Sequence, residues 1–238
     1  MKTRSDALEQ IARNIRDHGY HAYVVSGGPT PRWIYTIGLS PGLGYELIFA
    51  GGALYPKDDV LRIVRDKVTK ARADKRFLPN LSPDTDGFRF GSVCREWATQ
   101  LLIGANDFYQ THVAALQILP DQFRKTIDVP DLSAPLAVNQ ATPWRWLQEP
   151  WPYQIPRNAE AMTDLPVLMG ARVTEVARWE EGYWEAFSGS GDDVSREDAF
   201  LVPLGTLLGA DPSLEASTKL DIGKAMCRGQ TGDWQPWG

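Results

Sequence analysis

The chain has 238 residues, of which 43% are hydrophobic and 23% charged, so it holds enough apolar material for one or two compact domains. Its net charge of −5 repels phosphate backbones, and we therefore expect no nucleic-acid partner. No apolar run approaches the roughly 18 residues of a membrane span, and the charged start lacks a signal-peptide core. We expect no membrane association and a cytoplasmic location with reduced cysteines.

The first half of the chain alternates between patterns typical of helices and of strands. Leu8, Ile11 and Ile15 recur at helical spacing and predict a helix over residues 4–18, which Gly19 ends. A second helix is predicted over residues 56–74. Strands are predicted over residues 21–27, 33–39 and 45–52. A turn-rich stretch over residues 77–94 is predicted to lead into a fourth strand, which continues through Glu96–Leu102. Residues 107–119 are predicted to form a helix that runs into a fifth strand.

Residues 120–157 change character, because they hold seven prolines and the aromatic cluster PWRWLQEPWPY. Disordered linkers are poor in aromatic residues, so we predict an irregular connection anchored by its aromatic side chains. Beyond it, residues 171–180 and 182–189 read as two strands of a further unit. The predicted fold class is α+β, with a mixed or antiparallel sheet and two or three helices in residues 1–156 and a small β-rich module in residues 157–238.

Residues able to form a metal centre or a nucleophilic site are sparse. The histidines are His18, His21 and His112, and neither Cys94 nor Cys227 has a CxxC partner, so we expect no metal and no cofactor. Cys94 and His112 would form a thiol–imidazole pair if the fold brought them together. A buried structural thiol is the favoured interpretation of Cys94, and we expect no catalytic residues.

Aromatic residues are the most distinctive component of the chain, which holds nine tryptophans. Such residues either fill a core or form binding hot spots, and the sequence leaves both alternatives open. Trp33 and Tyr35 alternate along a predicted strand and so share one face. Together with the hydroxyl of Thr36, they are our candidate lining of a small-ligand pocket.

Acidic residues gather in the predicted hairpin near the C-terminus. A glycosidase-like pair is one interpretation, but a charged face for a basic protein is favoured, because complementary charge speeds encounter and fixes register. The candidate partner-binding residues are Glu180, Glu181, Trp184, Glu185, Asp192 and Asp193.

Two segments resemble known families. Residues from about 18 to 146 resemble the uncharacterised bacterial DUF4262 family through HGYHAYVV, WIYTIGL, YELIFAGG, LQILPD and the PW near residue 143, although Tyr45 replaces a proline of the family pattern. Residues from about 171 to 237 resemble the DUF2185 family, an immunity-protein family of toxin systems. That second resemblance rests on WEEGYWEAFSG, VPLGTLL, Asp211–Leu214 and GDWQPW.

These observations favour a non-enzymatic protein that binds another protein, and the second resemblance implies an immunity or antitoxin role against a bacterial toxin. The alternative is a small-molecule-binding protein or an enzyme with a pocket near Tyr35 and Thr36. The sequence does not determine the partner, the ligand or the oligomeric state.

Overall fold

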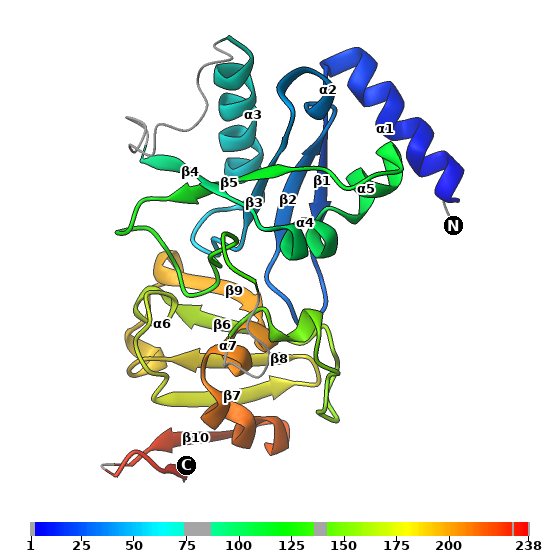
Figure 1. The fold of residues 1–238 in the computed structure, drawn as a ribbon. Helices are drawn as coiled ribbons and strands as arrows, with labels where there is room; N and C mark the ends of the chain where they lie inside the picture. The colour runs from blue at the N-terminus through cyan, green and yellow to red at the C-terminus, as the bar shows by residue number, and fades with distance from the viewer. Residues whose placement is uncertain (1–2, 74–86, 136–141, 230, 238) are drawn as a thin grey trace.

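The structure is a computed structural model that describes residues 3–73, 87–135, 142–229 and 231–237. Its two sheets lie one above the other, joined by a long connection (Figure 1). The first sheet has five strands and the second has six, and each contains one parallel pair. The predicted α+β class, with a β-rich C-terminal module, is confirmed.

The first sheet has the strand order β1-β2-β3-β5-β4. Its strands are β1 (His21–Val25), β2 (Trp33–Ile37), β3 (Glu46–Ala50), β4 (Phe88–Ser92) and β5 (Ala115–Pro120). β3 and β5 are parallel, and the other pairs are antiparallel. Every residue of β2 and of β3 is buried, which requires cover on both faces of the sheet.

Helices provide this cover on both faces. On one face, Val60 and Val64 of α3 (Lys57–Ala73) pack against the sheet. The opposite face is covered by α1 (Arg4–His18), α4 (Arg95–Leu101) and α5 (Ile103–Tyr109). The short α2 (Ser40–Leu43) lies between β2 and β3. None of the helices in the described ranges is both long and apolar enough to cross a bilayer.

The predicted first helix is confirmed, together with its end. Thr3 forms a capping box with Asp6, and Gly19 ends the helix in a left-handed conformation at φ 82°. The chain can therefore reverse directly into β1.

The predicted continuation of a strand through Glu96–Leu102 is wrong, because these residues form α4. Trp97, Ala98 and Leu101 are buried at helical spacing, and this period dominates over the β-rich appearance of the segment. The following helix also begins earlier than predicted, at Ile103. Most of the predicted turn-rich stretch, up to residue 86, lies outside the described residues.

The connection between the sheets is irregular, as predicted, and two of its tryptophans occupy different cores. Trp144 packs with Trp33 and Trp97 in the core of the first sheet. Trp146, within the 3-10 turn η1 (Arg145–Leu147), belongs to the core of the second sheet and donates its indole N–H to the Gly205 carbonyl at 2.6 Å. One short turn thus fixes both modules to the same segment.

The second sheet has the order β11-β10-β7-β8-β6-β9. Its strands are β6 (Glu160–Asp164), β7 (Glu175–Glu180), β8 (Tyr183–Phe187), β9 (Ala199–Pro203), β10 (Lys224–Arg228) and β11 (Trp234–Trp237). Between the strands lie α6 (Leu165–Leu168), η2 (Gly191–Asp193), η3 (Arg196–Asp198), α7 (Leu204–Ala210) and η4 (Pro212–Lys219). The inner face of this sheet packs on α7 and η4 around the fully buried Trp184.

Two glycines on α7 allow close contact between the modules. A Cβ atom on Gly205 would lie 2.2 Å from the Pro29 carbonyl oxygen, and one on Gly209 would lie 2.4 Å from the Thr142 carbonyl oxygen. These residues are four apart on the helix and so share one side. The glycines therefore permit α7 to pack directly on the backbone of the first module and of the connection.

Substituting Gly205→Ala is expected to lower the free energy of unfolding by about 1–3 kcal/mol, because the methyl group must displace backbone. This sign is opposite to the usual gain from Gly→Ala within a helix, which is about 0.5–1 kcal/mol. Gly42→Ala in α2 is the matched control, since a Cβ atom there meets nothing within 4 Å. Urea unfolding of both variants measures the effect, and an unchanged or more stable Gly205→Ala protein would contradict the described packing.

Candidate functional site

Of the three residues predicted to line a ligand pocket, Trp33 and Tyr35 line a cavity of about 420 Å³ between α1, β1, β2 and α5. Tyr35 stacks on Tyr23 with ring centroids 5.2 Å apart, and its hydroxyl accepts a hydrogen bond from the Gly104 N–H at 3.0 Å. An ion pair between Arg4 and Asp107 lies among the lining residues. The remaining walls are mostly apolar, so the cavity is suited to an apolar ligand. Binding of a small ligand here stays a prediction.

Thr36 does not line this cavity. As its neighbours in β2 point to one face, Thr36 points to the other, where its hydroxyl donates to a Glu46 carboxylate oxygen at 2.7 Å and accepts from the Leu47 N–H at 2.8 Å. The hydroxyl of Thr36 is thus fully engaged inside the protein, and it is absent from the lining of the cavity that holds Trp33 and Tyr35.

Glu46, which our interpretation of the sequence gave no role, is the centre of a buried polar cluster. Its side chain is fully buried at the start of β3, yet its carboxylate accepts five hydrogen bonds. The donors are the Thr36 hydroxyl at 2.7 Å, the N–H groups of Gly38, Leu39 and Ser40 at 3.1, 3.0 and 2.9 Å, and the Tyr109 hydroxyl at 3.0 Å. The carboxylate therefore holds together β2, the start of α2 and the end of α5.

The Tyr109 hydroxyl is affected by the same buried environment. Burial, together with the adjacent Glu46 carboxylate, raises the pKa of the Tyr109 hydroxyl, which stays a hydrogen-bond donor. The hydrogen bonds described for Glu46 all join it to groups of the protein itself. The cluster therefore positions the loop between β2 and β3. The only signal in the sequence was a lone carboxylate at the head of an apolar run.

The second sheet has an outer face, opposite α7, on which large apolar side chains are exposed. Trp179 and Trp237 are each 49% exposed and Leu201 is 52% exposed. Register places Trp237, Ala225, Ala177, Glu185, Met162 and Leu201 in one row across six strands. We call this surface the outer face, and define it by Trp179, Leu201, Trp237, Glu175, Glu185 and Phe187.

A hollow of about 290 Å³ on the outer face is lined by both aromatic and acidic groups. The Trp179 indole N–H donates to the Glu185 carboxylate at 2.7 Å, which fixes the orientation of the ring. Glu175 accepts from the Gly191 N–H at 3.1 Å at the other end of the hollow. Asp192 and Trp237 complete its rim.

The structure spreads the predicted acidic residues along β8 rather than gathering them at one point. Glu180 and Glu181 flank the turn before the strand, whereas Asp192 and Asp193 follow its other end and Glu185 lies between. Since the strand has five residues, its two end residues are roughly 13 Å apart.

Trp184 does not belong to the predicted contact surface. Its side chain is completely buried on the inner face, and its indole N–H donates to the Ser217 carbonyl at 3.2 Å. Alternation along the strand explains this position, because residues 184 and 185 must point to opposite faces.

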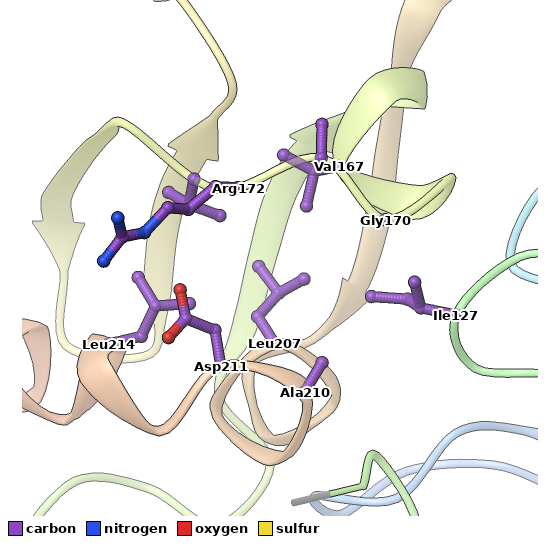
Figure 2. Close-up of a pocket in the computed structure, with 10 residues that line it drawn as sticks. Ile127, Val167, Gly170, Arg172, Leu207, Ala210, Asp211 and Leu214 are labelled. Atoms are coloured by element: carbon purple, nitrogen blue, oxygen red, sulfur yellow. The ribbon is translucent and has the colours of Figure 1, made fainter. Parts of the chain in front are cut away.

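A second hollow, of about 310 Å³, lies where the connection meets the C-terminal module (Figure 2). Ile127, Val167, Leu207 and Leu214 form apolar walls, and Arg172 and Asp211 add charged groups to the lining (Figure 2). The Asp211 carboxylate already accepts hydrogen bonds from Arg228 at 2.8 Å and from the N–H and hydroxyl of Ser213 at 3.0 and 2.5 Å. We therefore assign Asp211 a structural role at the start of η4.

Asp128 is a buried carboxylate at the junction between the first sheet and the connection. It accepts hydrogen bonds from the Thr126 hydroxyl at 2.5 Å and from the Ala53 N–H at 3.1 Å. Burial raises the pKa of this carboxyl group above the usual 3.8 for aspartic acid, an effect that the hydrogen bonds partly offset. Its backbone carbonyl accepts from the Trp144 indole at 2.8 Å, so the same residue also fixes the aromatic connection.

The histidines and cysteines are dispersed. Cys94 is the N-cap residue of α4 and not part of a strand, and its side chain is half-buried. Both Cys94 and Cys227 are free thiols. The His112 ring lies 3.5 Å from the Thr99 hydroxyl. Over the described parts of the chain, no three His, Cys, Asp or Glu side chains are grouped so that they could hold a metal ion.

Comparison with known families agrees with the N-terminal resemblance. Residues 14–123 match the family described as a domain of unknown function, DUF4262. No curated protein and no solved structure matches the chain. The matched residues include all five strands of the first sheet and end within the first residues of the connection, before its tryptophans. The resemblance of the C-terminal module to DUF2185 stays a prediction.

Substituting Glu46→Gln is expected to lower the free energy of unfolding by about 2–4 kcal/mol, because an amide NH₂ group would face N–H and O–H donors in a buried site. Glu9→Gln on the exposed side of α1 is the control, with an expected change within about 0.5 kcal/mol. Denaturant unfolding measures both variants. Equal stability of the two would show that the Glu46 cluster contributes little.

The buried Asp128 is expected to make the stability of the folded protein depend on pH. Because its folded pKa lies above its unfolded pKa, the native state binds more protons between the two values, and its contribution to stability falls as pH rises through that window. Asp128→Asn removes this contribution. We expect the stability of the wild type relative to Asp128→Asn to decline as pH rises from about 4 and then to level off. Urea unfolding across a pH series measures the difference, and a difference that grows with pH would contradict the assignment.

Proposed function

We propose that this chain is a non-enzymatic cytoplasmic protein that binds a basic protein partner on the outer face of its C-terminal sheet. The observation that carries the proposal is the exposure of Trp179 and Trp237 beside the carboxylates of Glu175 and Glu185, with Leu201 exposed on the edge strand β9 of the same face. Isolated exposed apolar residues are ordinary, whereas aromatic residues grouped on one open sheet face are typical of an interaction surface.

The distribution of tryptophans supports this reading. Five of the nine are buried and serve the cores: Trp33, Trp97, Trp144, Trp146 and Trp184. Trp179 and Trp237 are half-exposed and both line the hollow on the outer face. Aromatic side chains of this kind dominate binding energy because each buries a large area at a small cost in conformational entropy. The hydrogen bond to Glu185 restricts Trp179 before any partner arrives, which reduces that cost further.

The charge of the surface selects the chemistry of the partner. Glu175, Glu185 and Asp192 line the hollow, which holds no lysine or arginine among its described lining residues. Glu180 and Glu181 extend the negative charge to the turn before β8. A partner with lysine or arginine around an apolar centre would gain both steering and register from this arrangement.

This chemistry supports a toxin-neutralising role. Nucleic-acid-cleaving and other toxins that act on anionic substrates carry basic active sites, and an acidic, aromatic surface can cover such a site. The resemblance of residues 171–237 to an immunity-protein family supports the same role. The protein would then act by occlusion, with no reaction of its own.

The test is to look for a candidate toxin encoded beside the gene and to co-express the two proteins. The wild type is expected to restore growth and to form a complex with the toxin. Glu185→Arg and Trp179→Ala are each expected to weaken the complex by about 30-fold or more, the loss typical of a hot-spot residue of about 2 kcal/mol. Glu9→Arg, an exposed charge reversal on α1, is expected to leave binding unchanged.

The unfolding stability of Trp179→Ala should stay within about 1 kcal/mol of the wild type, since its ring is half-exposed, so that lost binding reports on the surface. No rescue and no complex with the wild type would overturn the proposal. A small molecule retained in a native mass spectrum, and displaced by filling the cavity at Tyr35, would favour the alternative function.

A further inference from the structure

A groove of about 710 Å³ lies on the first module, bounded by the end of α1, the edge strand β1 and the outer side of α3. Its volume falls within the range of sites for small organic molecules, roughly 300–1,000 Å³. Leu61, Val68 and Ala22 contribute apolar wall. The groove belongs to the N-terminal sheet and is separate from the outer face of the C-terminal sheet, so it is independent of the function proposed above.

The groove is cationic although the chain as a whole has a net charge of −5. Its lining includes Arg65, Arg72, His18 and His21, and none of its described lining residues is an aspartate or a glutamate. Arg65 forms no ion pair with a carboxylate in the part of the chain that the structure describes. A guanidinium in this setting is available to a ligand, and it binds oxyanions through paired N–H donors.

Helical spacing places the basic and apolar groups on one side of α3. Leu61, Arg65, Val68 and Arg72 recur at intervals of three and four residues, so their side chains form a single row along the groove. Arg65 and Arg72 are seven residues apart, or about 10 Å along the helix axis. The site is therefore elongated, with a cation toward each end and apolar surface between.

Arg72 is held in place by the turn after α1. Its guanidinium donates to the Gly19 carbonyl at 2.6 Å and lies 5.9 Å from the centre of the Tyr20 ring. A Cβ atom on Gly19 would lie 2.4 Å from an Arg72 nitrogen, so any larger residue at this position would displace the guanidinium. The Arg72 charge thus marks a fixed end of the groove, whereas Arg65 is free to adjust.

The imidazole of His21 adds a neutral polar group to the wall. Its Nδ1 atom lies 2.7 Å from the Asn14 amide nitrogen, and burial lowers the pKa of the ring below 6.5. His21 therefore offers the groove a hydrogen bond rather than a positive charge, and the guanidinium groups of Arg65 and Arg72 supply positive charge.

We propose that this groove binds a small organic phosphate, with the phosphate group on Arg65 and an apolar body lying along Leu61 and Ala22. A phosphate monoester carries up to two charges near neutral pH and offers several acceptor oxygens to the N–H donors of Arg65, more than a single carboxylate does, while Arg72 adds positive charge at the other end of the groove. The apolar wall distinguishes an organic phosphate from the inorganic ion.

Titration calorimetry of the full chain tests this inference, with phenyl phosphate as the probe. The wild type is expected to bind phenyl phosphate saturably, and at least about tenfold more tightly than inorganic phosphate or benzoate. Arg65→Gln is expected to weaken binding about tenfold, the loss of one charge-assisted contact. Arg62→Gln is the matched control on the same helix, since Arg62 is exposed and pairs with Asp59 outside the groove.

The imidazole resonances of His18 and His21 in an NMR titration locate the ligand and are expected to shift with phenyl phosphate. Absence of binding by the wild type, equal binding of benzoate or inorganic phosphate, or equal losses in Arg65→Gln and Arg62→Gln would each overturn the inference. Arg62 and Arg65 are both exposed on α3, so neither Arg62→Gln nor Arg65→Gln is expected to disturb folding.

Discussion

The arrangement of the whole chain depends on two tryptophans separated by one residue. Trp144 completes the core of the first sheet, where it contacts Trp33 and Trp97, and Trp146 enters the core of the second. Each indole N–H has a carbonyl acceptor, Asp128 for the first and Gly205 for the second, so neither buried polar group is left unsatisfied. The two modules are therefore joined by packing, and the connection between them is part of both cores.

The same constraint explains several details that look unrelated. Gly51 leaves room for the Asp128 carbonyl, since a Cβ atom there would lie 2.0 Å from that oxygen. Gly205 and Gly209 allow α7 to reach the first module and the connection. This packing covers the inner face of the second sheet and leaves its outer face open. The proposed partner surface therefore results from the way in which the modules join. The cationic groove lies at the far edge of the first sheet, so the two proposed sites use different modules.

Periodicity was enough to predict the elements that depend on local pattern. The helix over residues 4–18 and the strands around Tyr35 and Ile48 have strong apolar periods and clear glycine stops, and the structure contains them. The segment from Glu96 failed because its tryptophan and alternating apolar residues suit either state, and only burial against the sheet selects the helix. Strand β6 was missed because EAMTD has a weak pattern and its partners are distant in sequence.

For the candidate sites, the types of residue involved were easier to predict than the faces of the sheet to which their side chains point. Tyr35 and Trp33 do line a cavity, whereas Thr36 turns to Glu46, and Trp184 turns inward while Glu185 turns outward. A strand of alternating residues determines these directions only once the covered face is known, and that face depends on contacts from elsewhere in the chain. The cationic groove was invisible in sequence because its residues come from α1, β1 and α3, which meet only in the fold.

The position of Trp144 has a consequence for the order of events during translation. The last strand of the first sheet ends at Pro120, yet the interior of that sheet stays unsealed until a residue more than 20 positions later has left the ribosome. Trp146 emerges almost at the same moment, before any strand of the sheet that will receive it has left the ribosome. The nascent chain must therefore hold an exposed indole while the ribosome synthesises its C-terminal third, and this waiting period is the stage at which the protein has most need of a chaperone.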